Sequence, residues 1–154
     1  MQNIYDTLLD RHRKCTKSNV GHAYRHYAIF LHHGGAIKGG WGDKLTVGVN
    51  SAVPSFASAT THAEIDALNK INFWKGRPKK VDLVVIRFSK HGVLGDSRPC
   101  YHCLARLMSA NIGIKHVYYS TRDGTIVKEN FKTILDNPIT YISSGFRKRN
   151  KTNT

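Results

Sequence analysis

Three residues in this sequence have the types and spacing of ligands to a catalytic zinc ion. His62 stands alone, and Cys100 and Cys103 follow later in the chain as a Cys-x-x-Cys pair. Zinc prefers imidazole nitrogen and cysteine thiolate, and a catalytic zinc keeps three protein ligands so that water can take the fourth position. A structural zinc site normally has a fourth protein ligand, and the nearest candidate, His102, is expected to face away because it lies between the two cysteines. His62, Cys100 and Cys103 therefore predict a catalytic zinc site.

A carboxylate accompanies the first of these ligands. Glu64 follows His62 by two residues, inside the first turn of an expected helix. From there it can reach water at the metal without itself being a ligand, which is the position of a proton shuttle. The positive charge of the metal and of nearby helix N-termini favours thiolate over thiol and hydroxide over water. The sequence thus predicts hydrolytic chemistry with Glu64 as the catalytic residue.

Hydrophobic periodicity predicts the elements that must hold these residues. Helices are expected at residues 3–17, from His62 to Ile71, from Pro99–Cys100 through Met108, and at 129–136, and strands at 27–31, 45–49, 81–88, 114–120 and 125–127, with a last extended segment at 139–146. Thr60 or Thr61 is the expected cap of the second helix. Strands interleaved with helices indicate an α/β sandwich, and both metal-binding motifs open a helix. Arg122-Asp123-Gly124 predicts a hairpin, so that the fifth strand runs antiparallel to the fourth.

The two motifs together resemble a known superfamily. His62-Ala63-Glu64, followed by Pro99-Cys100-Tyr101-His102-Cys103, resembles the H-x-E…P-C-x-x-C signature of the zinc-dependent cytidine and deoxycytidylate deaminases. Residues 47–54 and 110–119 also resemble segments of deoxycytidylate deaminases, and the likeness covers roughly residues 22 to 121. It implies a cytidine-deaminase-like α/β/α sandwich with a central mixed sheet of about five strands. It also implies a zinc-dependent hydrolase that deaminates a cytosine nucleoside or nucleotide, with Glu64 as proton shuttle.

The resemblance also suggests residues that contact the substrate. By it, Asn50 would hydrogen-bond the sugar, Ala63 would offer a backbone group to the base, and Pro99 would set the turn of the cysteine motif. Arg98 is a candidate contact for a phosphate, and Tyr101 is a candidate for the lining of the substrate pocket.

The substrate within the superfamily stays open at this stage. Deoxycytidylate, editing and tRNA adenosine deaminases typically follow the fourth strand with a helix and a parallel fifth strand. The expected hairpin at residues 122–124 is more similar to the free-cytidine deaminases, which usually carry Cys where this chain has His62. The two features therefore favour different subfamilies.

The charge balance indicates an anionic partner. The net charge is +14 with a pI near 10.0, and only four of these charges come from the tail residues Arg147, Lys148, Arg149 and Lys151. Net charge informs about partners, and this excess suits nucleotides or nucleic acid. Two alternatives follow: a deaminase acting on bases in DNA or RNA, or a deaminase-derived basic protein that binds nucleic acid or a particle and has weak catalysis. Superfamily members often associate, so a homo-oligomer is also expected.

Length and composition limit the architecture and location. A chain of 154 residues suits one domain, expected at residues 1–146 and followed by a basic tail at 147–154. No stretch approaches the roughly 20 apolar residues of a membrane helix. The N-terminal segment lacks the apolar core of a secretion signal, and three cysteines cannot form a disulfide framework. The expected location is intracellular, cytoplasmic or nuclear.

Overall fold

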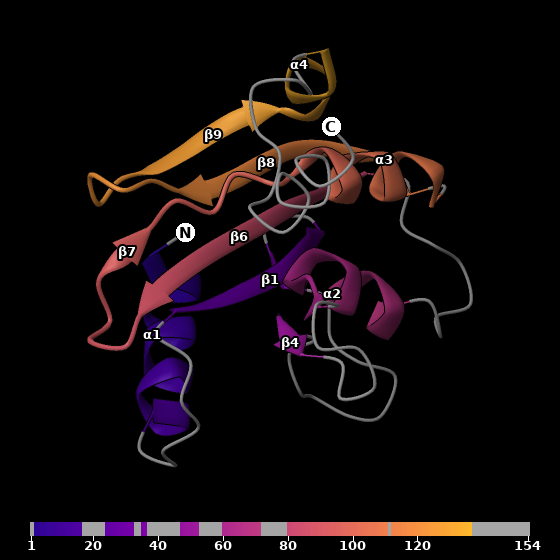
Figure 1. Ribbon diagram of the computed structural model, residues 1–154. Helices are drawn as coiled ribbons and strands as arrows, with labels where there is room; N and C mark the ends of the chain where they lie inside the picture. Colours follow the sequence, from indigo (N-terminus) through magenta and orange to yellow (C-terminus); the bar gives the residue numbers. More distant parts are fainter. Residues whose placement is uncertain are drawn as a thin grey trace, which may run out of the picture.

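A mixed β-sheet forms the centre of the computed structural model, which describes residues 2–16, 24–32, 35–36, 47–52, 60–71, 80–110 and 112–136 (Figure 1). Five strands follow one another across this sheet in the order β2 (Gly35–Ala36), β1 (Tyr24–His32), β6 (Val81–Ser89), β8 (Ile114–Ser120) and β9 (Ile126–Asn130). Short strands β3 (Gly48–Val49) and β7 (Leu94–Gly95) pair with β1 and β6, respectively. Strands β4 (Ser51–Ala52) and β5 (Thr60–Thr61) form a separate ladder.

The strand directions follow from the connections between the strands. β1 and β6 are antiparallel, whereas β6 and β8 are parallel and are joined through a helix, as parallel neighbours require. β9 returns antiparallel to β8, which confirms the hairpin predicted at residues 122–124 (Figure 1). Gly124 has a φ of +87°, a left-handed conformation that glycine adopts at little cost. Strand β9 thus begins at Ile126 and extends to Asn130, beyond the strand predicted at residues 125–127.

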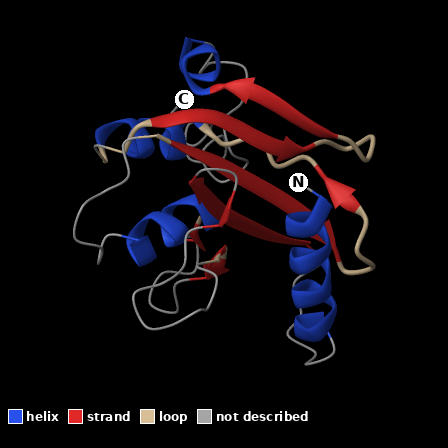
Figure 2. Ribbon diagram, turned by 180° about the vertical axis from the view of Figure 1, so that it is seen from behind, coloured by secondary structure: helices blue, strands red, loops and turns tan. Residues whose placement is uncertain are grey.

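The described part of the chain contains four helices that flank the sheet: α1 (Gln2–Thr16), α2 (Ala63–Ile71), α3 (Tyr101–Ser109) and α4 (Phe131–Asp136). Figure 1 shows α2 and α3 together on the right of the view and α1 on the left, and Figure 2 shows the same arrangement from behind. Among the described residues, no helix has the length and apolar character needed to cross a membrane.

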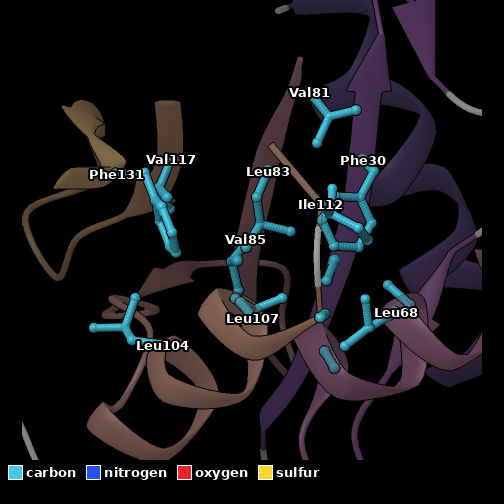
Figure 3. Close-up of a cluster of buried hydrophobic side chains, with 14 of the residues drawn as sticks. Phe30, Leu68, Val81, Leu83, Val85, Leu104, Leu107, Ile112, Val117 and Phe131 are labelled. Atoms are coloured by element: carbon cyan, nitrogen blue, oxygen red, sulfur yellow. The ribbon is translucent and has the colours of Figure 1, made fainter. Parts of the chain in front are cut away.

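Each face of the sheet has its own buried core. Along β6, alternate side chains point to opposite faces, so Leu83 and Val85 lie on one face and Val84 and Ile86 on the other. The first face packs against α2, α3 and α4 (Figure 3). The second face packs against Leu8 of α1. The molecule is therefore an α/β/α sandwich with a central mixed sheet, as predicted.

A buried histidine fastens α1 to the sheet. The Nε2 atom of His12 lies 2.7 Å from the carbonyl oxygen of Ser89, and its Nδ1 atom lies 3.0 Å from the hydroxyl of Tyr27. The ring also stacks on Phe88 with centroids 5.2 Å apart. Nε2–H donates to the carbonyl oxygen of Ser89 and Nδ1 accepts from Tyr27, so both ring nitrogens have hydrogen-bond partners. This contact holds the C-terminal end of β6.

Two predicted boundaries were wrong. Residues 129–130 belong to β9 rather than to the last helix, because the ladder with β8 pairs Glu129 with Val117 and Asn130 with His116. The residue directly before α2 is His62, whose carbonyl accepts the first helical hydrogen bond, whereas Thr60 and Thr61 form β5. The predicted segment at 139–146, the tail at 147–154 and residues 45–46 lie outside the described residues.

Candidate metal centre

The structure brings His62, Cys100 and Cys103 together. The Nδ1 atom of His62 lies 3.1 Å from Sγ of Cys103 and 3.5 Å from Sγ of Cys100, and all three ligand atoms lie within 4.8 Å of one another. Zinc–nitrogen bonds of about 2.0 Å and zinc–sulfur bonds of about 2.3 Å in a tetrahedron separate these atoms by about 3.5 Å. The donor types and their spacing therefore fit a tetrahedral zinc ion with three protein ligands.

Two helix N-termini present these ligands. His62 directly precedes α2, and Cys100 is the N-cap of α3, with φ −75° and ψ 163°. Each carbonyl accepts the first hydrogen bond of its helix, from Asp66 and Leu104 respectively. Cys103 lies in the first turn of α3, and side chains three residues apart share a helix face. The partial positive charge of both N-termini favours thiolate at this point.

Of the two cysteines, Cys103 keeps its proton and Cys100 loses its proton more readily. The hydrogen bond from Cys103 lowers the pKa of Cys100 to about 4, and the neighbouring His62 lowers it further against the opposing effect of burial. The same hydrogen bond, together with burial, raises the pKa of Cys103. The hydrogen bond with Cys100 also raises the pKa of His62. One cysteine is thus a thiolate at neutral pH, which is the form that binds a metal.

Glu64 is the one carboxylate that is buried in the described part of the chain. Its side chain is 5% exposed, and its Oε2 atom lies 3.7 Å from Sγ of Cys103. Burial raises the pKa of this carboxyl group, because it disfavours the charged form. A buried carboxyl group with a raised pKa, beside residues that could hold a metal, is suited to take up and release protons.

The sheet fixes the position of α2. A side chain at Gly48 of β3 would place its Cβ 2.1 Å from the carbonyl oxygen of Ala63 and 2.4 Å from the amide nitrogen of Ala67. Only glycine permits this close approach of helix and strand. The carboxylate of Asp66 then accepts a hydrogen bond of 2.9 Å from the amide of Val49. These contacts set where α2 begins, and hence where His62 and Glu64 lie.

Two buried serines fix the segment that leads to α3. The hydroxyl of Ser97 donates to the carbonyl of Val85 at 2.7 Å and accepts from the amide of Ser120 at 2.8 Å. The amide of Ser97 donates to the carbonyl of Ser120 at 2.9 Å. The chain is therefore tied to both β6 and β8 three residues before Cys100. Neither Ser97 nor Ser120 could be predicted from the sequence, because single serines carry no periodic signal.

Two of the predicted substrate contacts lie at the start of α2 and at the end of β3. Ala63 is fully buried as the first residue of α2. Asn50 follows β3, and its Oδ1 atom accepts a hydrogen bond of 2.9 Å from the amide of His26 on β1. Its Oδ1 is thus engaged with the protein backbone, and a sugar contact would come from the Nδ2 amide.

The other two predicted contacts are oriented differently. Arg98 is 16% exposed, and its Nε atom lies 3.8 Å from Oε2 of Glu129 on β9. This ion pair directs the guanidinium toward the sheet, so a phosphate contact by Arg98 remains a prediction. Tyr101 is 51% exposed at the first turn of α3. It therefore has space for contact with a ligand.

His26 is a further residue of this region that sequence reasoning did not single out. Its ring is mostly buried, which lowers its pKa to about 4, and the charges of Arg87 and His62 contribute to the same shift. It lies on β1 opposite Arg87 of β6. His26 is therefore a neutral ring close to the ligand His62. Its membership of a histidine-rich stretch was the only sign of it in the sequence.

Similarity in fold links the chain to two kinds of solved structure. No protein-family model matches the chain, and no curated protein matches it. A dCMP deaminase from the cyanophage S-TIM5, in complex with dCMP and dUMP, superposes with a TM-score of 0.51 at 16% identity, covering 93% of this chain and 97% of that one. A cytidine deaminase from Burkholderia pseudomallei superposes with a TM-score of 0.50 at 16% identity, covering 83% and 94%. The chain has the cytidine deaminase fold.

Proposed function

We propose that this protein is a zinc-dependent hydrolytic deaminase of a cytosine nucleoside or nucleotide. The observation that carries the proposal is the buried carboxyl group of Glu64 beside a group of three ligands, His62, Cys100 and Cys103, at two helix N-termini. The similar fold of a protein described as a dCMP deaminase, and crystallised with dCMP and dUMP, supports a cytosine nucleotide as substrate.

Glu64 performs the proton transfers of this reaction. Zinc held by the three ligands would lower the pKa of water enough for attack at neutral pH. At Oε2, the carboxylate of Glu64 takes one proton from the attacking water and delivers it to the ring nitrogen. It then carries a second proton to the departing amine. Water adds its oxygen to the ring carbon and ammonia leaves, so the reaction needs no other reactant.

The remaining substrate contacts are assigned as the resemblance to deaminases implies. The backbone of Ala63, at the start of α2, is assigned to the base, and the Nδ2 amide of Asn50 is assigned to the sugar. Tyr101 is assigned to the edge of the substrate pocket. Arg98 is the sequence-based candidate for a phosphate, and its ion pair with Glu129 competes with that role.

A substrate panel tests the proposal. The zinc-loaded protein is incubated with cytidine, deoxycytidine, deoxycytidylate and single-stranded oligonucleotides, and ammonia release is measured. Because general acid–base catalysis contributes about 10²- to 10⁴-fold, Glu64→Gln should lower turnover at least about 100-fold while zinc content is unchanged. Asp10→Asn, at an exposed carboxylate on α1, is the matched control and should leave turnover intact. Absence of Glu64-dependent turnover on every substrate would exclude the proposed function.

The net charge favours a second candidate, a deaminase that acts on bases within DNA or RNA. It uses the same ligands and Glu64, and the charge of +14 would attract the phosphate backbone. Turnover of the oligonucleotides alone would support it. Binding of oligonucleotides without turnover would instead support a basic binding protein derived from a deaminase.

A further inference from the structure

A concave site lies at the end of β6 and at the start of the segment that leads to α3. It is a pocket of about 620 Å³. Its lining comes from the end of β6, from β7 and the segments on either side of it, and from the turn between β8 and β9: Arg87, Ser89, His91, Val93, Leu94, Gly95, Asp96 and Arg122. Pockets that bind small ligands have volumes of about 300 to 1,000 Å³, so this one has the size of a ligand site.

Basic side chains outnumber acidic ones in this pocket. Arg87 and Arg122 are its two guanidinium groups, His91 adds an imidazole, and Asp96 is the single carboxylate. Oδ1 of Asp96 already accepts a hydrogen bond of 3.3 Å from the amide of Arg98. The Nη1 atom of Arg87 donates to the carbonyl oxygen of Asp96 at 3.4 Å, which holds one guanidinium in the pocket wall. Arginines held in this way recognise phosphate by charge-assisted hydrogen bonds.

The pocket and the metal centre share the segment that leads to α3. Asp96 lines the pocket and Cys100 follows it by four residues, which span at most about 14 Å. Arg87 faces the same side of the sheet as Leu83 and Val85, which is the side of α2 and α3. The pocket wall and the metal centre therefore lie on the same side of the sheet.

We propose that this pocket binds a phosphate group of the substrate while the base lies at the group formed by His62, Cys100 and Cys103. The inference rests on the proposed function and deepens it, because it selects nucleotides over nucleosides. A phosphate monoester of a free nucleotide and a phosphodiester of a single strand share the chemistry that Arg87 and Arg122 recognise. Arg98 is not part of the lining of this pocket, and its Nε atom lies 3.8 Å from Oε2 of Glu129.

Substitutions at Arg122 can test the proposed phosphate contact without disturbing the fold. It is exposed in the turn between β8 and β9. The backbone closes that turn, with the amide of Thr121 donating to the carbonyl of Thr125 at 2.9 Å and the amide of Gly124 donating to Thr121 at 3.2 Å. Neither hydrogen bond involves the Arg122 side chain. Arg122→Ala, Arg122→Glu and Arg122→Lys should therefore all fold.

The experiment measures binding, so that it does not depend on turnover. Deoxycytidylate, deoxycytidine and a short single-stranded oligonucleotide are titrated by calorimetry into zinc-loaded protein carrying Glu64→Gln. Loss of one charge-assisted hydrogen bond should weaken binding about tenfold. Arg122→Ala should therefore raise the Kd for the phosphate-bearing ligand about tenfold and Arg122→Glu should raise it more, whereas Arg122→Lys should restore most of the affinity. The Kd for deoxycytidine should change less than about twofold. Arg11→Ala, at an exposed arginine of α1, is the matched control and should change no affinity.

The ligand whose affinity depends on Arg122 identifies the source of the phosphate group. An effect on deoxycytidylate identifies the phosphate as that of a free nucleotide, and an effect on the oligonucleotide alone identifies it as a phosphodiester. Equal effects of Arg122→Ala and Arg11→Ala, an effect on deoxycytidine as large as that on deoxycytidylate, or no binding of either phosphate-bearing ligand would overturn the proposal. Binding that depends on Arg122 in a protein without deaminase activity would keep the phosphate site and exclude the proposed function.

Discussion

At the scale of single residues, burial and hydrogen bonding set the charge of each group at the metal centre before an ion binds. Cys100 is held as a thiolate by its hydrogen bond from Cys103, and Glu64 is shifted toward its neutral form by burial. Cys100 as a thiolate is in the form that can bind a metal, and Glu64 lies 3.7 Å from the neighbouring Cys103. The spacing within each motif is local in sequence, so both motifs could be recognised without the structure, whereas their approach to each other depends on the fold.

His26 makes the stability of the protein depend on pH. Its pKa is about 4 in the folded state, below its ordinary value of 6.5, so the unfolded chain binds the extra proton between these values. Stability should accordingly fall as the pH is lowered from about 6.5 toward 4. His26→Gln removes this dependence and should lose about 2 kcal/mol less than the wild type between pH 7 and pH 5. Urea unfolding at both pH values measures the difference. Equal losses in the two proteins would show that folding does not lower the pKa of His26.

At the scale of elements, the site depends on how α2 and α3 are fixed to the sheet. Periodicity predicted both helices and the central strand β6, because their apolar faces repeat at regular spacing. It did not reveal β7, which consists of Leu94 and Gly95, nor the hydrogen bonds between Ser97 and Ser120. These features depend on contacts between residues far apart in the chain, and no local pattern encodes them.

Gly48 tests the role of the contact between β3 and α2. An added Cβ would collide with backbone atoms of α2 at 2.1 and 2.4 Å, which cannot move aside as a flexible side chain can. Gly48→Ala should therefore lower the free energy of unfolding by about 3 kcal/mol, and it should weaken zinc binding because His62 directly precedes α2. Urea unfolding and zinc titration measure these effects.

Gly124→Asn provides a control for Gly48→Ala. Nothing lies within 4 Å of an added Cβ at Gly124, and asparagine tolerates positive φ better than most residues. This variant should cost less than about 1 kcal/mol and leave zinc binding unchanged. A Gly48→Ala protein as stable as Gly124→Asn would show that α2 is not fixed by this contact.

At the scale of the whole molecule, different helices cover the two faces of the sheet. One face packs on α1, whereas the other packs on α2, α3 and α4 and carries the metal centre. The layers and the mixed sheet were predictable from the alternation of strands and helices. The location of the basic pocket was not predictable, because its lining comes from the end of β6, from β7 and from the turn between β8 and β9.

The net charge of +14 predicts strong salt dependence for phosphate-rich ligands. Each phosphate that the protein neutralises releases counterions, so binding of a single-stranded oligonucleotide should weaken at least about tenfold between about 50 and 200 mM salt. Fluorescence anisotropy with a labelled oligonucleotide measures this. Uncharged deoxycytidine, followed by calorimetry, should show almost no such change. Oligonucleotide affinity that is independent of salt would contradict an electrostatic role for the basic surface.

The zinc content of the purified protein is the direct test of a zinc site at His62, Cys100 and Cys103. Protein purified without chelators is analysed by metal emission spectroscopy, alone and as Cys103→Ala and Cys15→Ala, the second being a cysteine of α1 outside the ligand group. About one zinc ion per chain is expected in the wild type and in Cys15→Ala, and a large loss of zinc is expected in Cys103→Ala. Zinc absent from the wild type, or retained in full by Cys103→Ala, would exclude a zinc site that includes Cys103.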